Sequence, residues 1–195
     1  GTGKTAVARI IAKVLYLLNI RNSQTLVEVD KSGLVGKYIG HTEEKTKEVI
    51  AKAQGGTLFI DEAYSLYDKD NPKDFGREAL NVLMKAMEDQ RDSFSVILAG
   101  YKKQMNEMLD ANVGLKSRIN YIIEIPNYTD EELLEIAGEI AEEKALIITE
   151  SGKKAIIERI NRERIDEKFG NACFIRNLID EAYSNLANRL ATSKH

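Results

Sequence analysis

The segment from Gly56 to Tyr64, GTLFIDEAY, constrains the fold more than any other stretch of the chain. Three consecutive apolar residues, Leu58 to Ile60, follow a glycine pair and a threonine and run directly into Asp61 and Glu62. A continuous apolar run of this kind is typical of a strand buried on both faces of a parallel sheet. Ligands of open α/β sheets lie outside the carboxyl ends of the strands, so we expect the two carboxylates to face a ligand. The alternative interpretation of the pair is a solvated strand end.

The first five residues, GTGKT, match the second half of the phosphate-binding pattern G-x-x-x-x-G-K-[ST]. Glycines let backbone N–H groups surround phosphate oxygens, Lys4 supplies a positive charge to the β and γ phosphates, and the Thr5 hydroxyl can bind Mg²⁺. The N-terminus of a following helix completes such an anion site. Together with the strand that ends in two carboxylates, the pattern predicts a nucleoside triphosphatase that binds its nucleotide through Gly1, Thr2, Gly3, Lys4 and Thr5.

Composition places the chain among ordinary globular proteins. Its 195 residues are 43% hydrophobic, which suits one domain or one domain with a small appendage. The net charge of −3 lacks the positive excess that is typical of nucleic-acid-binding proteins, so a nucleic-acid partner is not expected. The single cysteine, Cys173, excludes an intrachain disulfide and fits a reducing cytosol. No apolar run has the length of a membrane span and no signal peptide is recognisable, so we expect a cytoplasmic protein without a membrane partner.

Strand and helix patterns alternate over the first two thirds of the chain. Apolar residues recur at helical spacing after Thr5, and strand patterns follow at 25–29, 95–99 and 119–125, which predicts a parallel sheet covered by helices over residues 1–126. A phosphate loop normally follows a strand, and neither that strand nor the first glycine of the loop precedes Gly1. We therefore expect a fragment of a longer polypeptide that lacks the first strand of its sheet.

The pattern changes after Pro126. Thr129 and Glu132 form a capping box that opens a helix, and two further runs of helical spacing follow without a strand between them. Residues 127–195 are therefore predicted to form a small α-helical subdomain, hinged near Asn127.

Four motifs carry a resemblance to a known family: LVGKYIGHT at 34–42, LFIDEAYSL at 58–66, ILAGY at 97–101 and FGNACFIRN at 169–177. In this order and spacing they resemble an AAA+ ATPase, in which an α/β P-loop domain precedes an α-helical lid. Within that superfamily the motifs are most similar to the branch that contains stage V sporulation protein K and the CbbX-type rubisco activases. The Lys- and Ile-rich sequence favours the sporulation-type member.

The resemblance implies ATP hydrolysis with Mg²⁺ as cofactor. Asp61 is similar to the aspartate that holds hydrated magnesium, and Glu62 to the glutamate that orients and deprotonates the attacking water. Arg118 resembles the arginine finger that reaches the γ-phosphate held by a neighbouring subunit, a contribution of about 10³ to 10⁵ in rate in related phosphoryl transfers. The alternative for Arg118 is a surface ion pair at the end of a helix.

The resemblance also implies a ring and a protein substrate. Tyr38, with Lys37 and Ile39 beside it, resembles the pore-loop aromatic that grips an extended polypeptide in the central channel of a hexamer. We therefore expect a homo-oligomeric ring that acts on a protein with an extended or disordered tail. The alternative for Tyr38 is an anchor that folds back into the core.

Two positions depart from the family pattern. Gly100 and Tyr101 stand where many relatives carry a polar sensor, and the Tyr101 hydroxyl can either contact a phosphate or pack between sheet and helix. Cys173 stands where the branch often has arginine, so the lid contact with the nucleotide is assigned to Arg176, one turn further along the helix. Cys173 itself is expected to be a small buried hydrophobe.

Three other functions share parts of these patterns. A nucleic-acid motor of the clamp-loader or branch-migration type has the same ATP site but predicts basic loops. A small P-loop GTPase predicts an N-K-x-D signature, which the sequence lacks. A nucleotide-dependent scaffold binds ATP and assembles with little turnover.

Overall fold

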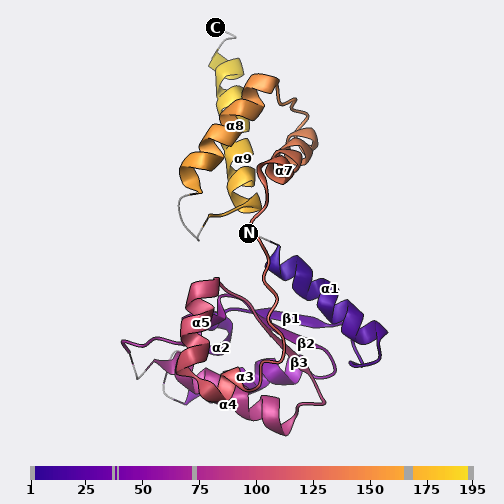
Figure 1. Cartoon of the computed structure of the whole chain (residues 1–195), viewed down its shortest axis with the longest axis vertical. Helices are drawn as coiled ribbons and strands as arrows, with labels where there is room; N and C mark the ends of the chain where they lie inside the picture. The colour runs from indigo at the N-terminus through magenta and orange to yellow at the C-terminus, as the bar shows by residue number, and fades with distance from the viewer. Residues whose placement is uncertain (1–2, 37, 39, 72–73, 165–168, 193–195) are drawn as a thin grey trace. The chain divides into compact units, whose positions relative to one another are not determined.

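The computed structural model describes residues 3–36, 38, 40–71, 74–164 and 169–192. They form two compact units, one spanning Gly3–Glu124 and one holding the described residues from Ile125 onward (Figure 1). The first unit contains every strand found among the described residues, and the second is helical.

The centre of the first unit is a parallel three-stranded sheet. Its strands β1 (Leu26–Val29), β2 (Thr57–Ile60) and β3 (Ser95–Leu98) lie in the order β1-β2-β3. Leu58 of β2 is in register with Val27 of β1 and with Val96 of β3. All four residues of β2 are buried, as the continuous apolar run predicts for the central strand.

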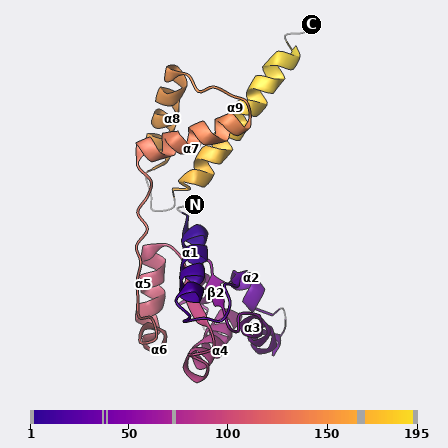
Figure 2. The same cartoon turned by 90° about the vertical axis from the view of Figure 1, so that its right-hand side faces the viewer.

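Alternating side chains of β2 supply the cores on the two faces of the sheet. Phe59 packs with Ala8 of helix α1 (Lys4–Leu17), where the small alanine lets the helix approach the strand closely. Leu58 and Ile60 point to the opposite face, in the core that contains residues of α3 (His41–Lys52) and α4 (Phe75–Asp89). The sheet therefore lies between α1 and the α3–α4 pair (Figure 1, Figure 2), which confirms the predicted parallel sheet flanked by helices.

Short elements connect these layers. They are the helix α2 (Lys31–Leu34), the 3₁₀ helix η1 (Ala63–Leu66), the helix α5 (Lys102–Ala111) and the helix α6 (Val113–Lys116). The backbone N–H of Ala63 donates to the carbonyl of Ala99 at 2.9 Å, so η1 is tied to the end of β3. This bond fixes the segment that follows β2 against the neighbouring strand.

The strand predicted at 119–125 is wrong. These residues are described, and they form neither strand nor helix. Tyr121, Ile122 and Ile123 are 87%, 73% and 63% exposed. A strand exists only through hydrogen bonds to a neighbouring strand, and no described strand pairs with this segment. Its apolar pattern is therefore present without the pairing that would turn it into a strand.

The described residues of the second unit form three helices: α7 (Asp130–Glu143), α8 (Glu150–Glu163) and α9 (Ala172–Thr192). The predicted capping box at the start of α7 is confirmed, because the Glu132 N–H donates to Thr129 Oγ1 at 3.2 Å and the Thr129 N–H donates to Glu132 Oε2 at 2.7 Å. Leu133, Ile160 and Ile175, one from each helix, are fully buried in a shared core. The predicted helical lid is thus confirmed. In the part of the chain that the structure describes, no helix is long and apolar enough to cross a bilayer.

Candidate functional site

The carboxyl end of β2 carries the two predicted carboxylates. The Asp61 N–H donates to the carbonyl of Val29 at 2.8 Å, so the hydrogen-bond ladder continues one residue beyond the strand. Asp61 Oδ1 then accepts the N–H of Glu62 at 2.9 Å. Glu62 has φ 47° and ψ 43°, a left-handed conformation that costs a non-glycine residue about 1–2 kcal/mol. Such strain is concentrated at functional sites, and here it turns the chain so that Glu62 is exposed beside the half-buried Asp61.

The N-terminus of α1 supplies the positive part of the site. Gly3, at φ 81°, caps the helix in the left-handed conformation that glycine adopts without strain, and no side chain caps the helix with a hydrogen bond. The first turn carries no acidic residue, so no carboxylate in that turn compensates the positive end of the helix dipole. Lys4 and Thr5 follow directly and are half-buried. Gly1 and Thr2 lie outside the described residues.

Two tyrosines lie between Lys4 and the carboxylates. The Lys4 ammonium lies 5.0 Å from the centre of the Tyr101 ring, and that ring lies 6.1 Å from the ring of Tyr64. A Cβ on Gly100 would come within 2.7 Å of the Tyr64 ring, so glycine at this position allows the close packing. Burial raises the pKa of Tyr64, and the adjacent Glu62 carboxylate raises it further, so the Tyr64 hydroxyl keeps its proton at neutral pH.

This arrangement suits the binding of a nucleoside triphosphate with a hard cation. The helix N-terminus and the Lys4 ammonium attract phosphate, while the Asp61 carboxylate and the Thr5 hydroxyl are oxygen ligands of the kind that Mg²⁺ prefers. Among the described residues, no group of three or more His, Cys, Asp or Glu side chains could hold a metal. Mg²⁺ is commonly bound through one or two carboxylates together with substrate phosphates, so the donors present fit this ion.

Arg118 follows α6 and lies against α4. Its Nη2 forms an ion pair with Glu88 Oε2 at 3.0 Å, and its Nη1 donates to the carbonyl of Gly114 at 2.7 Å. The guanidinium is thus engaged within its own chain, as the surface ion-pair alternative requires. The predicted contact of Arg118 with a nucleotide in a neighbouring subunit stays a prediction.

The loop predicted to contact a polypeptide substrate exposes its tyrosine. Tyr38 is 68% exposed and its ring meets the ring of His41 edge-on at 5.5 Å, so it does not anchor the loop in the core. Lys37 and Ile39 lie outside the described residues. The base of the loop is fixed, because the Gly36 N–H donates to Thr42 Oγ1 at 3.0 Å and a Cβ on Gly36 would meet His41 Cβ at 2.6 Å.

The lid residues singled out in the sequence lie near the start of α9. Arg176 is exposed, and its predicted contact with a nucleotide stays a prediction. Cys173 is also exposed, so the expectation of a buried hydrophobe is wrong. Position 173 lies in the first turn of α9, and the buried positions nearby are Asn171, Ile175 and Ile179, which define a face that excludes Cys173.

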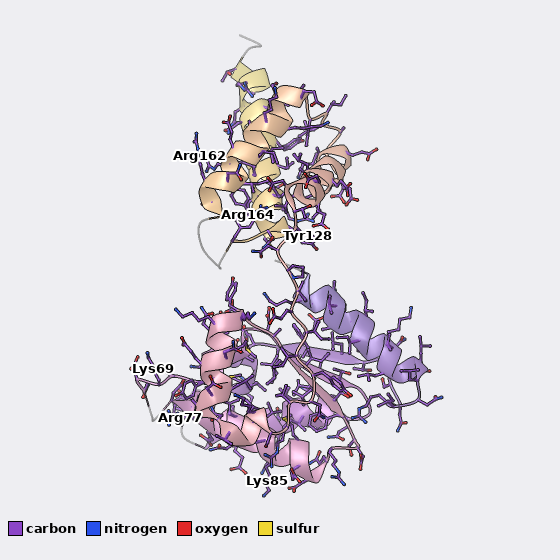
Figure 3. All side chains as sticks on the ribbon, viewed as in Figure 1. Lys69, Arg77, Lys85, Tyr128, Arg162 and Arg164 are labelled. Carbon is purple, nitrogen blue, oxygen red and sulfur yellow. The ribbon has the colours of Figure 1, made fainter. Side chains whose placement is uncertain are left out.

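Sequence reasoning missed a polar cluster in the lid. The buried side chain of Asn171 accepts the N–H of Tyr128 at 3.1 Å and donates to Asn127 Oδ1 at 2.9 Å and to the Phe169 carbonyl at 3.0 Å. Arg164 adds a bond to the Tyr128 carbonyl at 3.1 Å. Figure 3 labels both residues in the helical unit. The segment at 127–128 is therefore bound to the lid. The available sequence signal was the Gly-Asn pair, since Asn171 has φ 47° and asparagine tolerates that conformation.

Comparison with known proteins gives two family matches that meet near this segment. Residues 1–127 match the ATPase family associated with various cellular activities (AAA), and residues 129–195 match the AAA lid domain.

Several named relatives are similar over nearly the whole chain. The "Protein CfxQ homolog" of Galdieria sulphuraria is 49% identical over 195 residues, which is 100% of this chain and 64% of the relative. "Protein CbbX" of Cereibacter sphaeroides is 47% identical over 99% of this chain and 62% of the relative. The chloroplastic ribulose bisphosphate carboxylase/oxygenase activase of Cyanidioschyzon merolae is 44% identical over 97% of this chain and 65% of the relative.

This chain thus spans less than two thirds of the length of these relatives. They support the CbbX side of the predicted branch, and the expected closeness to the sporulation-type member finds no support among them. The family match covers the α/β unit with its sheet and candidate phosphate site, and the lid match covers the helical unit. The chain belongs to the AAA family of ATPases.

Proposed function

We propose that this chain is the ATP-hydrolysing core, residues 1–126, and the lid, residues 127–195, of a ring-forming ATPase that remodels a protein partner. The proposal depends on one observation, which is that contacts connect the start of α1 with the residues after β2. Lys4 at the start of α1 and Glu62 after β2 lie at the two ends of the contacts made by Tyr101 and Tyr64. Family membership supplies ATP as the nucleotide.

Each residue of the site has a proposed role. Gly1, Thr2 and Gly3 surround the phosphates with backbone N–H groups, and Lys4 neutralises charge on the β and γ phosphates. Asp61 and Thr5 hold Mg²⁺, which supplies further neutralisation of phosphate charge when bound. Glu62 orients the attacking water and accepts its proton.

Two further residues act outside this phosphate site. Arg118 stabilises the transition state in the neighbouring subunit, and Arg176 is the proposed contact of the lid with the nucleotide. This role of Arg118 requires a ring, because a residue that acts in trans needs a neighbour on each protomer.

The proposed partner is a protein, engaged through Lys37, Tyr38 and Ile39. The exposure of Tyr38 on a loop with a fixed base supports this role, because an exposed aromatic at the tip of a positioned loop is typical of a binding element. One relative is named an activase of ribulose bisphosphate carboxylase/oxygenase, so we favour a protein substrate of the activase type over a sporulation role. A hexameric ring, an extended or disordered tail on the substrate and a cytoplasmic location complete the proposal.

The experiment that tests this function is ATP turnover per protomer across a range of protein concentrations, for the parent protein and for Arg118→Ala. A site shared between subunits requires turnover per protomer to rise with concentration in the parent and to stay flat in the variant. Turnover that is independent of concentration would contradict a shared site. Absence of turnover with ATP binding retained would instead identify a nucleotide-dependent scaffold.

The role of Tyr38 needs a separate measurement. Tyr38→Ala should abolish remodelling of a protein substrate while leaving basal ATP hydrolysis largely intact, because the exposed Tyr38 ring contacts His41 and takes no part in the contacts of the phosphate site. Equal loss of both activities would count against a substrate-gripping loop. Stimulation of turnover by single-stranded or duplex DNA in the parent would favour a nucleic-acid motor instead.

A further inference from the structure

The guanidinium of Arg118 is held by its own chain in a pose that leaves one buried donor without a partner. Nη2 pairs with Glu88 Oε2 at 3.0 Å and Nη1 donates to the Gly114 carbonyl at 2.7 Å. Nε is buried and has no hydrogen-bond partner among the described residues. A buried N–H without a partner is costly, so this pose satisfies the arginine incompletely.

The partners of Arg118 also have other interactions. The Gly114 carbonyl already accepts the Ser117 hydroxyl at 2.9 Å, so both of its lone pairs are used. Glu88 lies in the last turn of α4, where its negative charge faces the negative end of the helix dipole and no basic residue lies in that turn. The positive charge of Arg118 is therefore attracted to this helix end as well as to the carboxylate.

The pair is placed so that it can open. The Glu88 side chain is 62% exposed and the Arg118 side chain 29% exposed, and ion pairs with this much solvent contact are weak and exchangeable. A phosphate with two negative charges competes well for a guanidinium, because it accepts two parallel N–H bonds in the geometry that arginine offers.

From this geometry we infer that Glu88 is a latch that holds Arg118 within its own protomer and competes with the γ-phosphate of the neighbouring subunit. The inference rests on the proposed role of Arg118 as a residue that acts in trans. When a neighbour presents its nucleotide, Nη2 leaves Glu88 for the phosphate, and the carboxylate remains in solvent. Glu88 thus raises the protein concentration at which shared sites become active.

The test is turnover per protomer against protein concentration for Glu88→Gln, which keeps the shape of the side chain and removes its charge. We expect the concentration for half-maximal turnover to fall about two- to fivefold, the range that release of an exposed ion pair allows. The thermal midpoint should stay the same or rise slightly, because the substitution removes a negative charge from the C-terminal end of α4.

The matched control is Asp89→Asn. Asp89 is exposed in the same last turn of α4, and no ion pair between it and Arg118 is found among the described residues. The substitution removes the same charge from the same helix end, so it should leave the concentration dependence unchanged. An equal shift in both variants would show a general charge effect and would overturn the latch.

Two further outcomes separate failure of the latch from failure of the proposed function. If Arg118→Ala flattens the concentration dependence and Glu88→Gln behaves like the parent or has lower turnover, Arg118 acts in trans and the latch is wrong. If Arg118→Ala has no effect, the trans role fails and the latch falls with it. The double variant Glu88→Gln/Arg118→Ala should match Arg118→Ala alone, because a latch has no effect once the residue it holds is absent.

Discussion

The two ends of the β-sheet use their polar groups in different ways. At the amino end, Arg21 donates five hydrogen bonds: to the carbonyls of Ile20, Arg91, Asp92 and Phe94 and to the hydroxyl of Ser95. A guanidinium has five N–H donors, so all of them are used within the chain. At the carboxyl end, Asp61 accepts one local N–H and Glu62 is exposed in a strained conformation.

This difference separates stability from chemistry within one sheet. A side chain whose hydrogen bonds all lie within the protein stabilises the fold and has nothing left to offer a ligand. A carboxylate held on a strained turn contributes little to stability and remains available to a ligand. Substitutions at the two ends should therefore have opposite effects on stability and turnover.

The largest effect is expected at the carboxyl end. Glu62→Gln should lower ATP turnover by about 10² to 10⁴, because the amide cannot accept a proton from water. ATP affinity and the thermal midpoint should stay near those of the parent, because Glu62 is exposed. Single-turnover hydrolysis and nucleotide binding, measured on the same preparation, check this prediction.

The matched control for that variant is Glu107→Gln, the same substitution at an exposed position of α5. It should leave turnover unchanged. If Glu62→Gln lost thermal stability as well as turnover, the carboxylate would support the fold. The contrast between the two ends would then be wrong.

The second effect is expected at the amino end. Arg21→Ala should lower the free energy of unfolding by about 1.5–3 kcal/mol, since it removes hydrogen bonds to the loop before β3 and leaves a partly buried carbonyl without a donor. Turnover per folded molecule should not change. Urea denaturation followed by circular dichroism measures the stability, with Arg91→Ala as the control, because the Arg91 side chain is 76% exposed and should cost less than about 0.5 kcal/mol.

The sequence predicts a feature of this contrast only where the residues that cause it lie close together in the chain. Asp61 and Glu62 were predictable because an apolar run that ends in two acids is a pattern within a few neighbouring residues. The capping box at Thr129 and Glu132 was predictable for the same reason. The bonds of Arg21 to residues about 70 positions later leave no local pattern, so the sequence offers no sign of them.

The failures follow the same rule. The segment at 119–125 has the pattern of a strand, but pairing depends on a neighbour that its own residues do not specify. Asn171 lies within the FGNACFIRN motif that carries the family resemblance, and its buried bonds to Asn127 and Tyr128 depend on how α9 meets the start of the lid. The exposure of Cys173 likewise depends on which face of α9 is buried. Spacing within the helix gives the position of Cys173 relative to that face, but it does not identify the face.

The third effect concerns packing at the carboxyl end. Gly100→Ala would bring a Cβ within 2.7 Å of both Met105 Sδ and the Tyr64 ring. Methionine can move, while the ring is held beside Tyr101, so we expect a loss of about 1–2 kcal/mol in stability and a fall in turnover as the tyrosines shift. Differential scanning calorimetry and steady-state turnover test the two parts.

Gly138→Ala is the control for the change in residue type. Gly138 lies in α7 with open space around it, so alanine should raise stability by up to about 1 kcal/mol through helix propensity. A Gly100→Ala variant that loses stability but keeps full turnover would show that the Tyr64–Tyr101 pair packs the edge without serving the chemistry.

The smallest effect is expected at Asp30, which follows β1 at the same carboxyl end as Asp61. Unlike Asp61, it is used by the structure: its carboxylate caps α2, accepting the Gly33 N–H at 3.0 Å and the Ser32 hydroxyl at 2.6 Å. These bonds lower the pKa of Asp30 from its ordinary value of 3.8, with the Ser32 hydroxyl as the main cause. Asp30→Ala should therefore cost about 0.5–1 kcal/mol, as expected for loss of a helix cap, and leave turnover unchanged.

The pH dependence of the unfolding free energy tests the prediction for Asp30 most directly. A carboxylate with a lowered pKa in the folded state stabilises the protein above the pKa of the unfolded chain, and this contribution is lost as the pH falls through the lower folded value. The difference in unfolding free energy between the parent and Asp30→Ala should thus be constant from pH 7 to about 5 and shrink below about pH 3.8. Urea titrations at several pH values measure it. A difference that does not shrink as the pH falls below 3.8 would mean that Asp30 stabilises α2 without its charge, and a loss of turnover would place it with Asp61 in the chemistry of the site.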